Sequence, residues 1–387
     1  MFDYVIIGTG FAGSVLAERI ATQLNKKVLM IEKRNHIGGN AYDSYDSQGI
    51  LIHNYGPHIF HTKVKKVWDY LSNFTDWHLY HHKVLGVIDG QKVPIPFNLN
   101  SIQQVFPKNL AERLEKKLIE NFGYNKKVPI LKLREVEDTD LKFLADYIYE
   151  KVFLGYTTKQ WGVTPEELDP SVTGRVPVYI SRDDRYFQDP YQGMPKEGYT
   201  KLFERMLDHE NIKILLNTDY KEVLQFNLET GEASLFGQKF SGKIIYTGPI
   251  DYFFDYKFGQ LPYRSLNCVF EQFNQKQVQE VGTVNYPNDY NFTRITEFKH
   301  LTNQSSDKTT TVKEFSQEYI PGENTPYYPI KNENNLELYK LYKEEARKYD
   351  NLIFIGRLAE YQYYDMDMVI GRALKVFEEK ITNFSRR

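Results

Sequence analysis

The chain has 387 residues, of which 41% are hydrophobic and 26% are charged, and its formal net charge is −2. This length suffices for two or three domains whose cores need no disulfide or metal. The near balance of charge excludes a general nucleic-acid or anionic-membrane surface. A single cysteine, Cys268, excludes an internal disulfide and a multi-cysteine metal site. Because the sequence has neither a membrane-spanning apolar run nor signal-peptide features, we expect a cytoplasmic protein without nucleic-acid partners or membrane insertion.

The first residues match a dinucleotide-binding fingerprint. Residues 3–7 form an apolar run that predicts a buried strand, and G-x-G-x-x-G follows at once with Gly8, Gly10 and Gly13. A helical pattern comes next, so the glycines lie between a strand and a helix, as this motif requires. Gly8 permits the tight turn, Gly10 lets the backbone approach a pyrophosphate, and Gly13 lets the helix pack on the strand. The free N–H groups at the helix start are suited to phosphate.

The segment that follows favours FAD over NAD. A second predicted strand, 28–31, ends at Glu32, and an acidic residue there accepts ribose hydroxyls and disfavours a 2′-phosphate. The double glycine Gly38-Gly39 resembles the extended motif of the glutathione-reductase-type FAD proteins. Two buried strands and a helix start continue this pattern, at 244–248, 352–357 and 365–367. A plain Rossmann sheet without flavin is the alternative.

The middle of the chain changes from helical to strand periodicity. One helix is predicted to end at Gly123, a second to begin near 138–140, and a third to begin at 164–167 with a capping box. Beyond residue 210 the pattern indicates strands, a hairpin and a polar loop, at 212–216, 229–232, 262–300 and 303–311.

We therefore predict an α/β fold: a Rossmann-type FAD-binding domain of the glutathione-reductase-like kind, with a helical insertion and an antiparallel β-sheet substrate domain. The predicted boundaries are approximate and interleaved. The FAD-binding domain is expected to comprise residues 1–90, 195–250 and 345–387. The helical substrate-binding domain, with a mobile loop, is expected at 98–190, and the sheet domain at 210–235 and 260–330.

Seven short strings, in order along the chain, resemble the UDP-galactopyranose mutase family. They are GPHIFHT (56–62), VPIPFNL (93–99), FLGYTTKQWG (153–162), GRVPVYISRDDRYF (174–187), FTRITE (292–297), YYPI (327–330) and GRLAEYQYYDMD (356–367). The resemblance, to the bacterial type, implies an isomerase that interconverts UDP-galactopyranose and UDP-galactofuranose. It implies a covalent galactosyl adduct at N5 of reduced FAD and no net redox change. It also implies a homodimer that serves galactofuranose biosynthesis for cell-surface polysaccharide.

The same resemblance implies that Arg175 and Arg294 hold the substrate diphosphate and that His58 lies in a loop over the flavin, and these three residues are the predicted catalytic set. Independently, a diphosphate is best held by fixed guanidinium groups, which a near-neutral protein must supply locally. The alternatives are a surface arginine for Arg175 and an ion pair between Arg294 and Glu297. Arg182 and Arg185 are expected to form a solvated charge cluster.

Further substrate contacts follow from the resemblance. The hydroxyls of Tyr186, Tyr328 and Tyr363 are expected to reach the phosphates, and Asp365 to orient Tyr363 or the ligand. Uracil is expected to stack on Tyr156, with three residues nearby: Phe153, Thr157 and Gln160. Trp161 is expected to lie on a mobile loop that closes over the galactose, and Asn98 and Asn285 are additional candidates. The alternatives are packing roles for the tyrosines and a hydrophobic plug for Trp161.

The predicted cofactor contacts combine the fingerprint, the double-glycine segment and the last strand–helix junction. They are Gly8, Gly10, Phe11, Ala12, Gly13, Glu32, Lys33, Gly38, Gly39, Asn40, His58, Ile59, Arg357, Asp367 and Met368. No metal is expected, because no carboxylate or cysteine has suitable spacing to the histidines.

The competing enzyme class is an FAD-dependent oxidoreductase of the amine-oxidase type. A second dinucleotide fingerprint would favour it, but the sequence contains one G-x-G-x-x-G motif. A flavin-loaded nucleotide-sugar carrier without turnover is a further alternative. The sequence leaves open whether the galactose carries a 2-acetamido group, which reductant is used, and which glycan receives the furanose.

Overall fold

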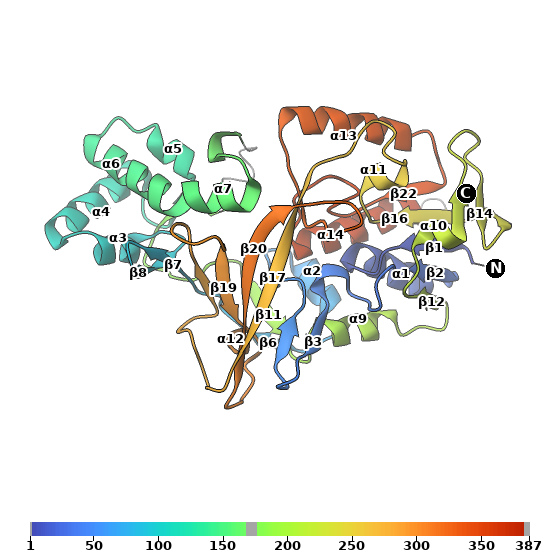
Figure 1. Cartoon of the computed structure of the whole chain (residues 1–387), viewed down its shortest axis with the longest axis horizontal. Coiled ribbons are helices and arrows are strands. Elements are labelled where there is room, and N and C mark those ends of the chain that lie inside the picture. Colours follow the sequence, from blue (N-terminus) through green and yellow to red (C-terminus); the bar gives the residue numbers. More distant parts are fainter. Residues whose placement is uncertain (1, 168–175, 383–387) are drawn as a thin grey trace.

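The computed structural model describes residues 2–167 and 176–382. Three parts follow one another across Figure 1: a parallel sheet with both termini near it, a long antiparallel sheet in the centre, and a group of helices at the far end. Among the described residues, no helix is both long and apolar enough to cross a membrane.

The parallel sheet is assembled from segments that lie far apart in the sequence. Its order is β12-β2-β1-β16-β22, with all neighbours parallel. Its strands are β1 (Tyr4–Ile7), β2 (Val28–Ile31), β12 (Ile212–Leu215), β16 (Lys243–Tyr246) and β22 (Leu352–Phe354). The residues of β1 and β2 are buried throughout, since helices and loops cover both sheet faces.

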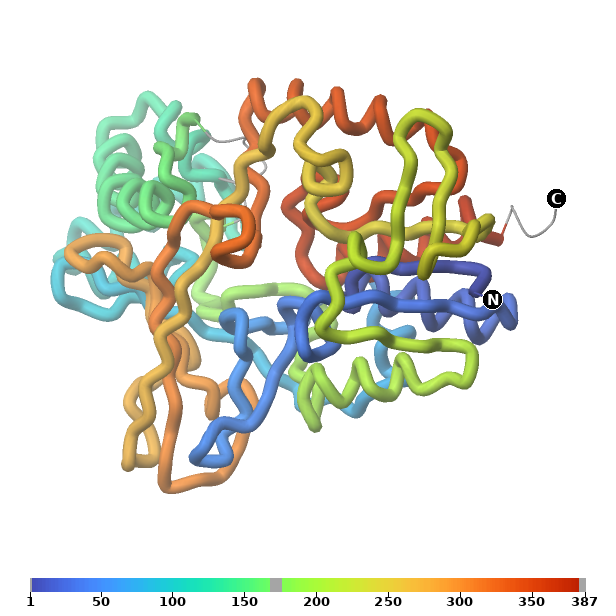
Figure 2. The backbone as a smooth tube through the Cα atoms, turned by 45° about the vertical axis from the view of Figure 1, so that its right-hand side comes forward, coloured from blue at the N-terminus to red at the C-terminus, as the bar shows by residue number. Residues whose placement is uncertain are grey.

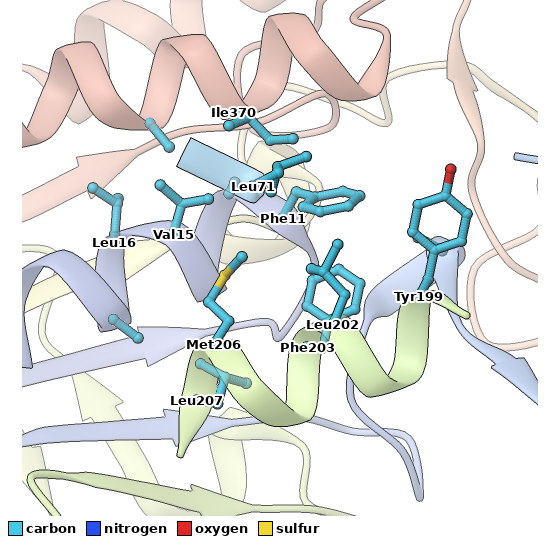
Figure 3. Packing of buried hydrophobic residues seen from close by; sticks show 14 of the residues in the cluster. Phe11, Val15, Leu16, Leu71, Tyr199, Leu202, Phe203, Met206, Leu207 and Ile370 are labelled. Atoms are coloured by element: carbon cyan, nitrogen blue, oxygen red, sulfur yellow. The ribbon is translucent and has the colours of Figure 1, made fainter. Parts of the chain in front are cut away.

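Three helices pack together on one side of this sheet. They are α1 (Phe11–Leu24), α9 (Tyr199–Leu207) and α14 (Met366–Val376). Figure 3 shows Phe11 and Val15 of α1 between Phe203 of α9 and Ile370 of α14, and the rings of Phe11 and Phe203 lie 4.6 Å apart. The start of the chain is therefore packed against its last long helix.

The central sheet has the order β21-β17-β20-β19-β18-β7-β8 and is antiparallel except where β18 runs parallel to β7. Its strands are β7 (Val84–Ile88), β8 (Gln91–Ile95), β17 (Tyr263–Phe273), β18 (Thr283–Asn285), β19 (Arg294–Glu297), β20 (Thr309–Glu318) and β21 (Tyr328–Pro329). Figure 2 shows β17 and β20 as two long adjacent segments between the helical part and the parallel sheet.

The helical part has its own hydrophobic core. Its elements are α3 (Leu99–Val105), α4 (Lys108–Phe122), α5 (Ile130–Arg134), α6 (Thr139–Ile148), a π-helix (Tyr149–Leu154) and α7 (Gly155–Trp161). As predicted, α4 ends at Gly123, and α6 begins after Asp138, whose side chain accepts from two backbone N–H groups.

Smaller elements connect these parts. The short strands are β3 (Asp43–Tyr45), β4 (Leu51–His53), β5 (Phe60–Thr62), β6 (Trp77–Leu79), β9 (Lys126–Val128), β10 (Val178–Ile180), β11 (Tyr191–Pro195), β13 (Leu224–Phe226), β14 (Ala233–Leu235) and β15 (Gln238–Phe240). The remaining helices are α2 (Lys65–Leu71), α10 (Tyr220–Val223), α11 (Ile250–Phe253), α12 (Phe298–Thr302) and α13 (Glu333–Ala346). Short 3-10 or π turns lie at Gly39–Ala41, Pro165–Glu167 and Phe377–Ile381.

The structure confirms the α/β fold class and corrects several local predictions. Strand β12, which the predicted ranges placed in both the cofactor domain and the antiparallel domain, is the edge strand of the parallel sheet and pairs there with β2. Strand β7, predicted at the end of the cofactor domain, belongs to the central sheet. The predicted hairpin at 229–232 is present between β13 and β14, whereas the polar loop 303–311 ends where β20 begins. The predicted domain boundaries stay predictions.

The predicted helix at 164–167 is one 3-10 turn within the described residues. Its capping contact is nevertheless formed, because the Glu167 carboxylate accepts hydrogen bonds from the backbone N–H and the hydroxyl of Thr164.

Candidate active site

A large cavity lies where the glycine-rich turn, the double-glycine turn and the start of α14 meet. Its empty volume, which includes the open solvent at its mouth, is about 1260 Å³. Eleven predicted cofactor contacts line it: Gly8, Gly10, Phe11, Ala12, Glu32, Lys33, Gly38, Gly39, Asn40, His58 and Arg357. The cavity therefore suits an extended dinucleotide rather than a single ring.

Three glycines at or next to this cavity, Gly8, Gly39 and Gly13, are in places where a side chain cannot fit. A Cβ on Gly8, whose φ is +101°, would lie 2.1 Å from Thr247 Oγ1. A Cβ on Gly39 would lie 2.9 Å from the Cα of Gly10, so the two turns touch through their backbones. Gly13 lies outside the cavity lining, and a Cβ there would meet Gly8 O at 2.1 Å. The positive φ of Gly8 suits the tight turn, and the contact at Gly13 suits close packing of helix on strand, as the motif predicts.

The acidic residue of the motif is engaged with the glycine-rich turn. Glu32 accepts hydrogen bonds from the backbone N–H and the hydroxyl of Thr9, at 3.1 and 2.9 Å. Its other oxygen accepts from Arg34 N at 3.1 Å. Burial lowers the pKa of the neighbouring Lys33. The lining residue Arg34, missed by the sequence analysis, donates to Asn40 Oδ1 at 2.9 Å and lies over the ring of Tyr55.

The start of α14 reaches the cavity through different side chains from those predicted. Met366 and Val369 line it, whereas the side chain of the predicted Met368 is 49% exposed and lies outside the lining, so this contact stays a prediction. The reason is the helical period, which places residues three apart on one face and the residue between them on another. Asp367 accepts from Met368 N at 2.8 Å, and burial raises its pKa. Asp367 and Ile59 lie outside the lining.

His58 lies at the cavity wall and is neutral. Its Nδ1 donates to Gly56 O at 2.8 Å, and its backbone N–H donates to Nδ1 of His53 at 2.9 Å. Burial lowers the pKa of His58 to about 3 and does the same for His53. With the proton on Nδ1, the Nε2 atom of His58 is an acceptor.

Arg294 is held by a carboxylate from the neighbouring strand. Its Nε and Nη2 donate to the two oxygens of Glu314 at 2.6 and 2.8 Å, and Glu314 is 1% exposed. The alternative, an ion pair between Arg294 and Glu297, is wrong. The carboxylate of Glu297 instead accepts hydrogen bonds from Val278 N, Gln279 N and the Thr309 hydroxyl. Glu314 was missed, since only the pairing of β19 with β20 sets Arg294 opposite it.

Tyrosines gather around this pair. The positive charge of Arg294 acts on the phenols of Tyr156 and Tyr328 and opposes the burial that raises their pKa values. Tyr186 and Tyr363 interact electrostatically with Tyr156 in the same place. The structure therefore brings all four predicted tyrosines together, two of them, Tyr156 and Tyr328, next to the guanidinium.

Arg357 supplies a second fixed positive charge next to them. Its Nε and Nη2 donate to Tyr364 O at 2.9 and 2.5 Å, and its guanidinium lies 5.3 Å from the ring centre of Tyr328 and 5.7 Å from that of Tyr363. A cation held by carbonyls and stacked on aromatic rings keeps its charge available to an anion.

Trp161 is a buried part of this aromatic group. It is 6% exposed, and its ring centre lies 5.8 Å from that of Tyr328 and 5.3 Å from that of Tyr363. Thr157 and Gln160, on the same helix, are partly exposed, and Asp365 occupies the N-cap position of α14 without a side-chain hydrogen bond to the helix. Phe153 lies in the core of the helical part, which gives it a packing contact.

The two asparagines differ. Asn98 is 1% exposed, accepts from the N–H groups of Asn100 and Ser101, and donates to Asp184, so it caps α3 and its predicted substrate contact lacks support. Asn285 is partly exposed and lies directly opposite Arg294 on β18, so its predicted substrate contact stays a prediction.

The remaining predictions concern charge and metal. Arg182 and Arg185 form surface ion pairs with Glu115 and Asp183, as expected. Arg175 lies outside the described residues. Among the residues that the structure describes, no group of three or more metal-ligating side chains comes together.

Comparison with known proteins identifies the family. A model described as UDP-galactopyranose mutase matches residues 151–363, and one described as an NAD(P)-binding Rossmann-like domain matches 6–74. A probable UDP-galactopyranose mutase of Klebsiella pneumoniae is 38% identical, over 100% of this chain and 96% of its own length. The chain belongs to the UDP-galactopyranose mutase family. The family is one of isomerases.

Two further relatives are about as similar to this chain, but one of them is named for a different nucleotide sugar. The UDP-galactopyranose mutase of Mycoplasma genitalium is 38% identical, over 98% of this chain and 95% of its own length. A dTDP-fucopyranose mutase of Escherichia coli is 37% identical, over 99% of each chain. Overall sequence identity therefore does not distinguish between the two nucleotide sugars in these names, and the side chains of the site must decide between them.

Solved structures show the same fold. A crystal structure of reduced UDP-galactopyranose mutase superposes with a TM-score of 0.74 at 15% identity, over 100% of this chain and 95% of that one. A double mutant of putrescine oxidase superposes with a TM-score of 0.60 at 12% identity, over 98% and 99%. This chain resembles the oxidase only in its fold, whereas it resembles the mutases in sequence as well. The comparisons therefore favour the mutase family over the amine-oxidase alternative.

Proposed function

We propose that the chain interconverts UDP-galactopyranose and UDP-galactofuranose with bound, reduced FAD. The observation that carries this proposal is a cluster of one carboxylate-anchored guanidinium, that of Arg294, and four tyrosines: Tyr156, Tyr186, Tyr328 and Tyr363. A diphosphate needs fixed cations and hydroxyl donors, and a base needs aromatic faces.

The cavity supports FAD as the cofactor. Helix α1 has no side-chain cap, so the N–H groups of its first turn are available to a pyrophosphate at Phe11 and Ala12. Helix α14 likewise has no side-chain cap and points its start at the cavity through Met366. When bound and reduced, FAD supplies a nucleophile for the anomeric carbon of the sugar. The positive end of α14 favours negative charge beside it.

The protein's own residues then bind, orient and stabilise charge. Arg294 and Arg357 stabilise the negative charge that develops on the departing diphosphate. The four tyrosines direct hydroxyls at the phosphates and an aromatic face at the base. His58 offers its neutral Nε2 as a hydrogen-bond acceptor, and Trp161 excludes water from the reacting sugar. Arg175 stays the second predicted diphosphate ligand.

A second candidate is the corresponding isomerisation of dTDP-fucopyranose. It is favoured by the 37% identity, over 99% of each chain, to the dTDP-fucopyranose mutase of Escherichia coli. The matching family description favours the uridine nucleotide of galactose. We further propose a cytoplasmic homodimer that supplies galactofuranose for cell-surface polysaccharide.

The test is an anaerobic assay of the purified flavoprotein with UDP-galactofuranose, with products separated by chromatography. We expect no conversion by the oxidised protein and conversion after dithionite reduction, without stoichiometric use of reductant. Equal activity of the oxidised protein, or one reductant consumed per product, would contradict the proposal. A parallel assay with dTDP-fucofuranose decides between the two nucleotide sugars through the ratio of kcat/KM values.

A further inference from the structure

Helix α7, which carries Tyr156 and Trp161, is fastened to the central sheet through its own backbone. Its last turn leaves carbonyl oxygens that no further helical N–H can reach. Arg264 of β17 donates from Nε to Gln160 O at 3.0 Å and from Nη2 to Lys159 O at 3.3 Å. The hydroxyl of Ser316 on β20 donates to Gln160 O at 2.7 Å and accepts from Arg264 at 3.1 Å.

These contacts are suited to hold a helix end. Within the described residues, each side-chain hydrogen bond of Arg264 goes to a neutral oxygen of Lys159, Gln160 or Ser316. The carboxylate of Glu318, opposite Arg264 on β20, interacts with the guanidinium electrostatically but without a hydrogen bond, so the directed contacts of the cation are with the helix end and Ser316. A cation at the C-terminal end of a helix interacts favourably with the end carbonyls and the helix dipole. Gly162 follows with φ +74°, and a Cβ there would lie 3.2 Å from Arg264 Nη1.

A second attachment holds the other side of α7. Lys159 Nζ donates to three backbone carbonyls in the loop between β18 and β19: those of Tyr286, Tyr290 and Phe292. Gly155, at the start of the helix, is so close to this loop that a Cβ would lie 2.5 Å from Pro287 O. The helix is therefore attached at its start and at its end.

Arg264 also holds the opposite side of the aromatic group. Its backbone C=O accepts from Tyr327 N at 2.9 Å, and it pairs with Tyr328 in the register of β17 with β21. Its side chain holds α7, which brings Trp161 to 5.8 Å from Tyr328. One residue thus links the strand that carries Tyr328 to the helix that carries Trp161.

We propose that Arg264 is a positioning residue, which fixes α7 against β21 so that Tyr156 and Trp161 face Tyr328 and Arg294 in the geometry that binds the nucleotide. Arg264 acts through the end carbonyls of α7 and lies outside the lining of the cofactor cavity. This inference rests on the proposed function for its consequence on UDP binding. Its structural part, the fixing of α7, can be measured without any ligand.

The experiment compares the flavin-loaded wild type with Arg264→Met, Arg264→Lys and Ser316→Ala. The matched control is Arg113→Met, because Arg113 is an arginine of α4 whose partner is Asp140 on the surface of the helical part. Hydrogen–deuterium exchange of peptides covering 155–163 reports on α7 directly, and calorimetry with UDP reports on nucleotide binding. Flavin content and thermal unfolding report on the rest of the fold.

We expect Arg264→Met to speed amide exchange in 155–163 but not in α4 or α14, and to weaken UDP binding at least about tenfold. Arg264→Lys should recover part of both effects, Ser316→Ala should show a smaller effect of the same kind, and Arg113→Met should match the wild type. Unchanged exchange in 155–163 in both Arg264 variants would overturn the inference. If Arg264→Met does not fold, the comparison of Arg264→Lys and Ser316→Ala with the wild type decides in the same way.

The experiment distinguishes failure of the proposed function from failure of the positioning role of Arg264. If the wild type itself does not bind UDP, the proposed function is contradicted, while faster exchange in 155–163 would still support the fixing of α7. If UDP binds and exchange rises without weaker binding, Arg264 holds the helix but does not position it for the nucleotide, and the inference is overturned.

Discussion

Arg294 and Glu314 face each other across β19 and β20 and share two hydrogen bonds, of 2.6 and 2.8 Å. The side chain of Glu314 is 1% exposed and that of Arg294 is 27% exposed, so the arginine alone reaches the site. The carboxylate holds the guanidinium in one orientation and offsets part of its charge. A diphosphate therefore meets a cation whose orientation is already fixed before binding.

The ion pair between Arg294 and Glu314 predicts that a second substitution can restore the stability lost in an Arg294 variant without restoring its turnover. Arg294→Ala should lower turnover at least about tenfold, from the loss of charge-assisted bonds of roughly 1.5–3 kcal/mol, and should also destabilise the fold because Glu314 is left buried and unpaired. Arg294→Ala with Glu314→Ala should regain stability without regaining turnover. Urea unfolding and the anaerobic assay check the two effects. A double variant as unstable as Arg294→Ala, or an active one, would contradict the assignment.

The glycine turns predict a backbone-specific loss of flavin. Gly39→Ala would set a Cβ 2.9 Å from the Cα of Gly10 at the cavity wall, and we expect most of the bound flavin to be lost. Gly49→Ala is the matched control, because its φ of +76° is also positive but a Cβ there meets nothing within 4 Å. Flavin absorbance of the two purified variants is the measurement. Equal flavin content would show that contact between the two turns is unnecessary for cofactor binding.

Trp161 predicts a loss of nucleotide-sugar binding. Trp161→Ala removes a buried ring between Tyr328 and Tyr363, and we expect UDP to bind at least about tenfold more weakly. Trp161→Phe keeps an aromatic ring and should bind more tightly than the alanine variant. Tryptophan fluorescence should change when UDP is added to the wild type. An identical change in Trp161→Phe would assign the signal to Trp68 or Trp77 instead.

Asp251 predicts a pH dependence of stability. Burial raises its pKa to about 6, one oxygen accepts from Leu261 N at 2.8 Å, and the other has no hydrogen-bond partner within the described residues. Because the folded-state pKa lies above the usual value, the folded state retains the proton longer. This contribution to stability is present below about pH 4 and is lost as pH rises to about 6.

The matched measurement is the free energy of unfolding of the wild type and Asp251→Asn at several pH values. The difference between them should shift in favour of the asparagine variant between about pH 4 and pH 6, by roughly 3 kcal/mol or less. A constant difference across this window would mean that Asp251 titrates normally.

Features set by a few consecutive residues could be predicted from the sequence. The strand, glycine turn and helix at the start of the chain depend on local sterics, as does the cap of α6 at Asp138. That Met366 and Val369, and not the side chain of Met368, line the cavity depends on how α14 is rotated against the rest of the fold, which a local pattern does not set. The family resemblance, rather than any local pattern, gave the four tyrosines that gather around Arg294.

Partners across strands and helix ends could not be predicted. Glu314 is 20 residues from Arg294 in the sequence, and their pairing depends on the register of two strands. Arg264 reaches a helix about a hundred residues away, through carbonyls that any sequence would supply. An asparagine such as Asn98 can serve equally well as a polar ligand contact or as a helix cap. Its position directly before α3 in the folded chain shows that it is a cap.

The order of the parallel sheet has a consequence for the synthesis of this protein. Strand β1 pairs with β16 as well as with β2, and β16 pairs with β22, which ends at Phe354. The cavity wall further needs Val369, and Ile370 packs near Phe11 (Figure 3). In a nascent chain β1 therefore stays unpaired on one edge until β16 has left the ribosome, and the cavity wall stays incomplete until α14 has left it. Cofactor uptake is for this reason a late, post-translational event.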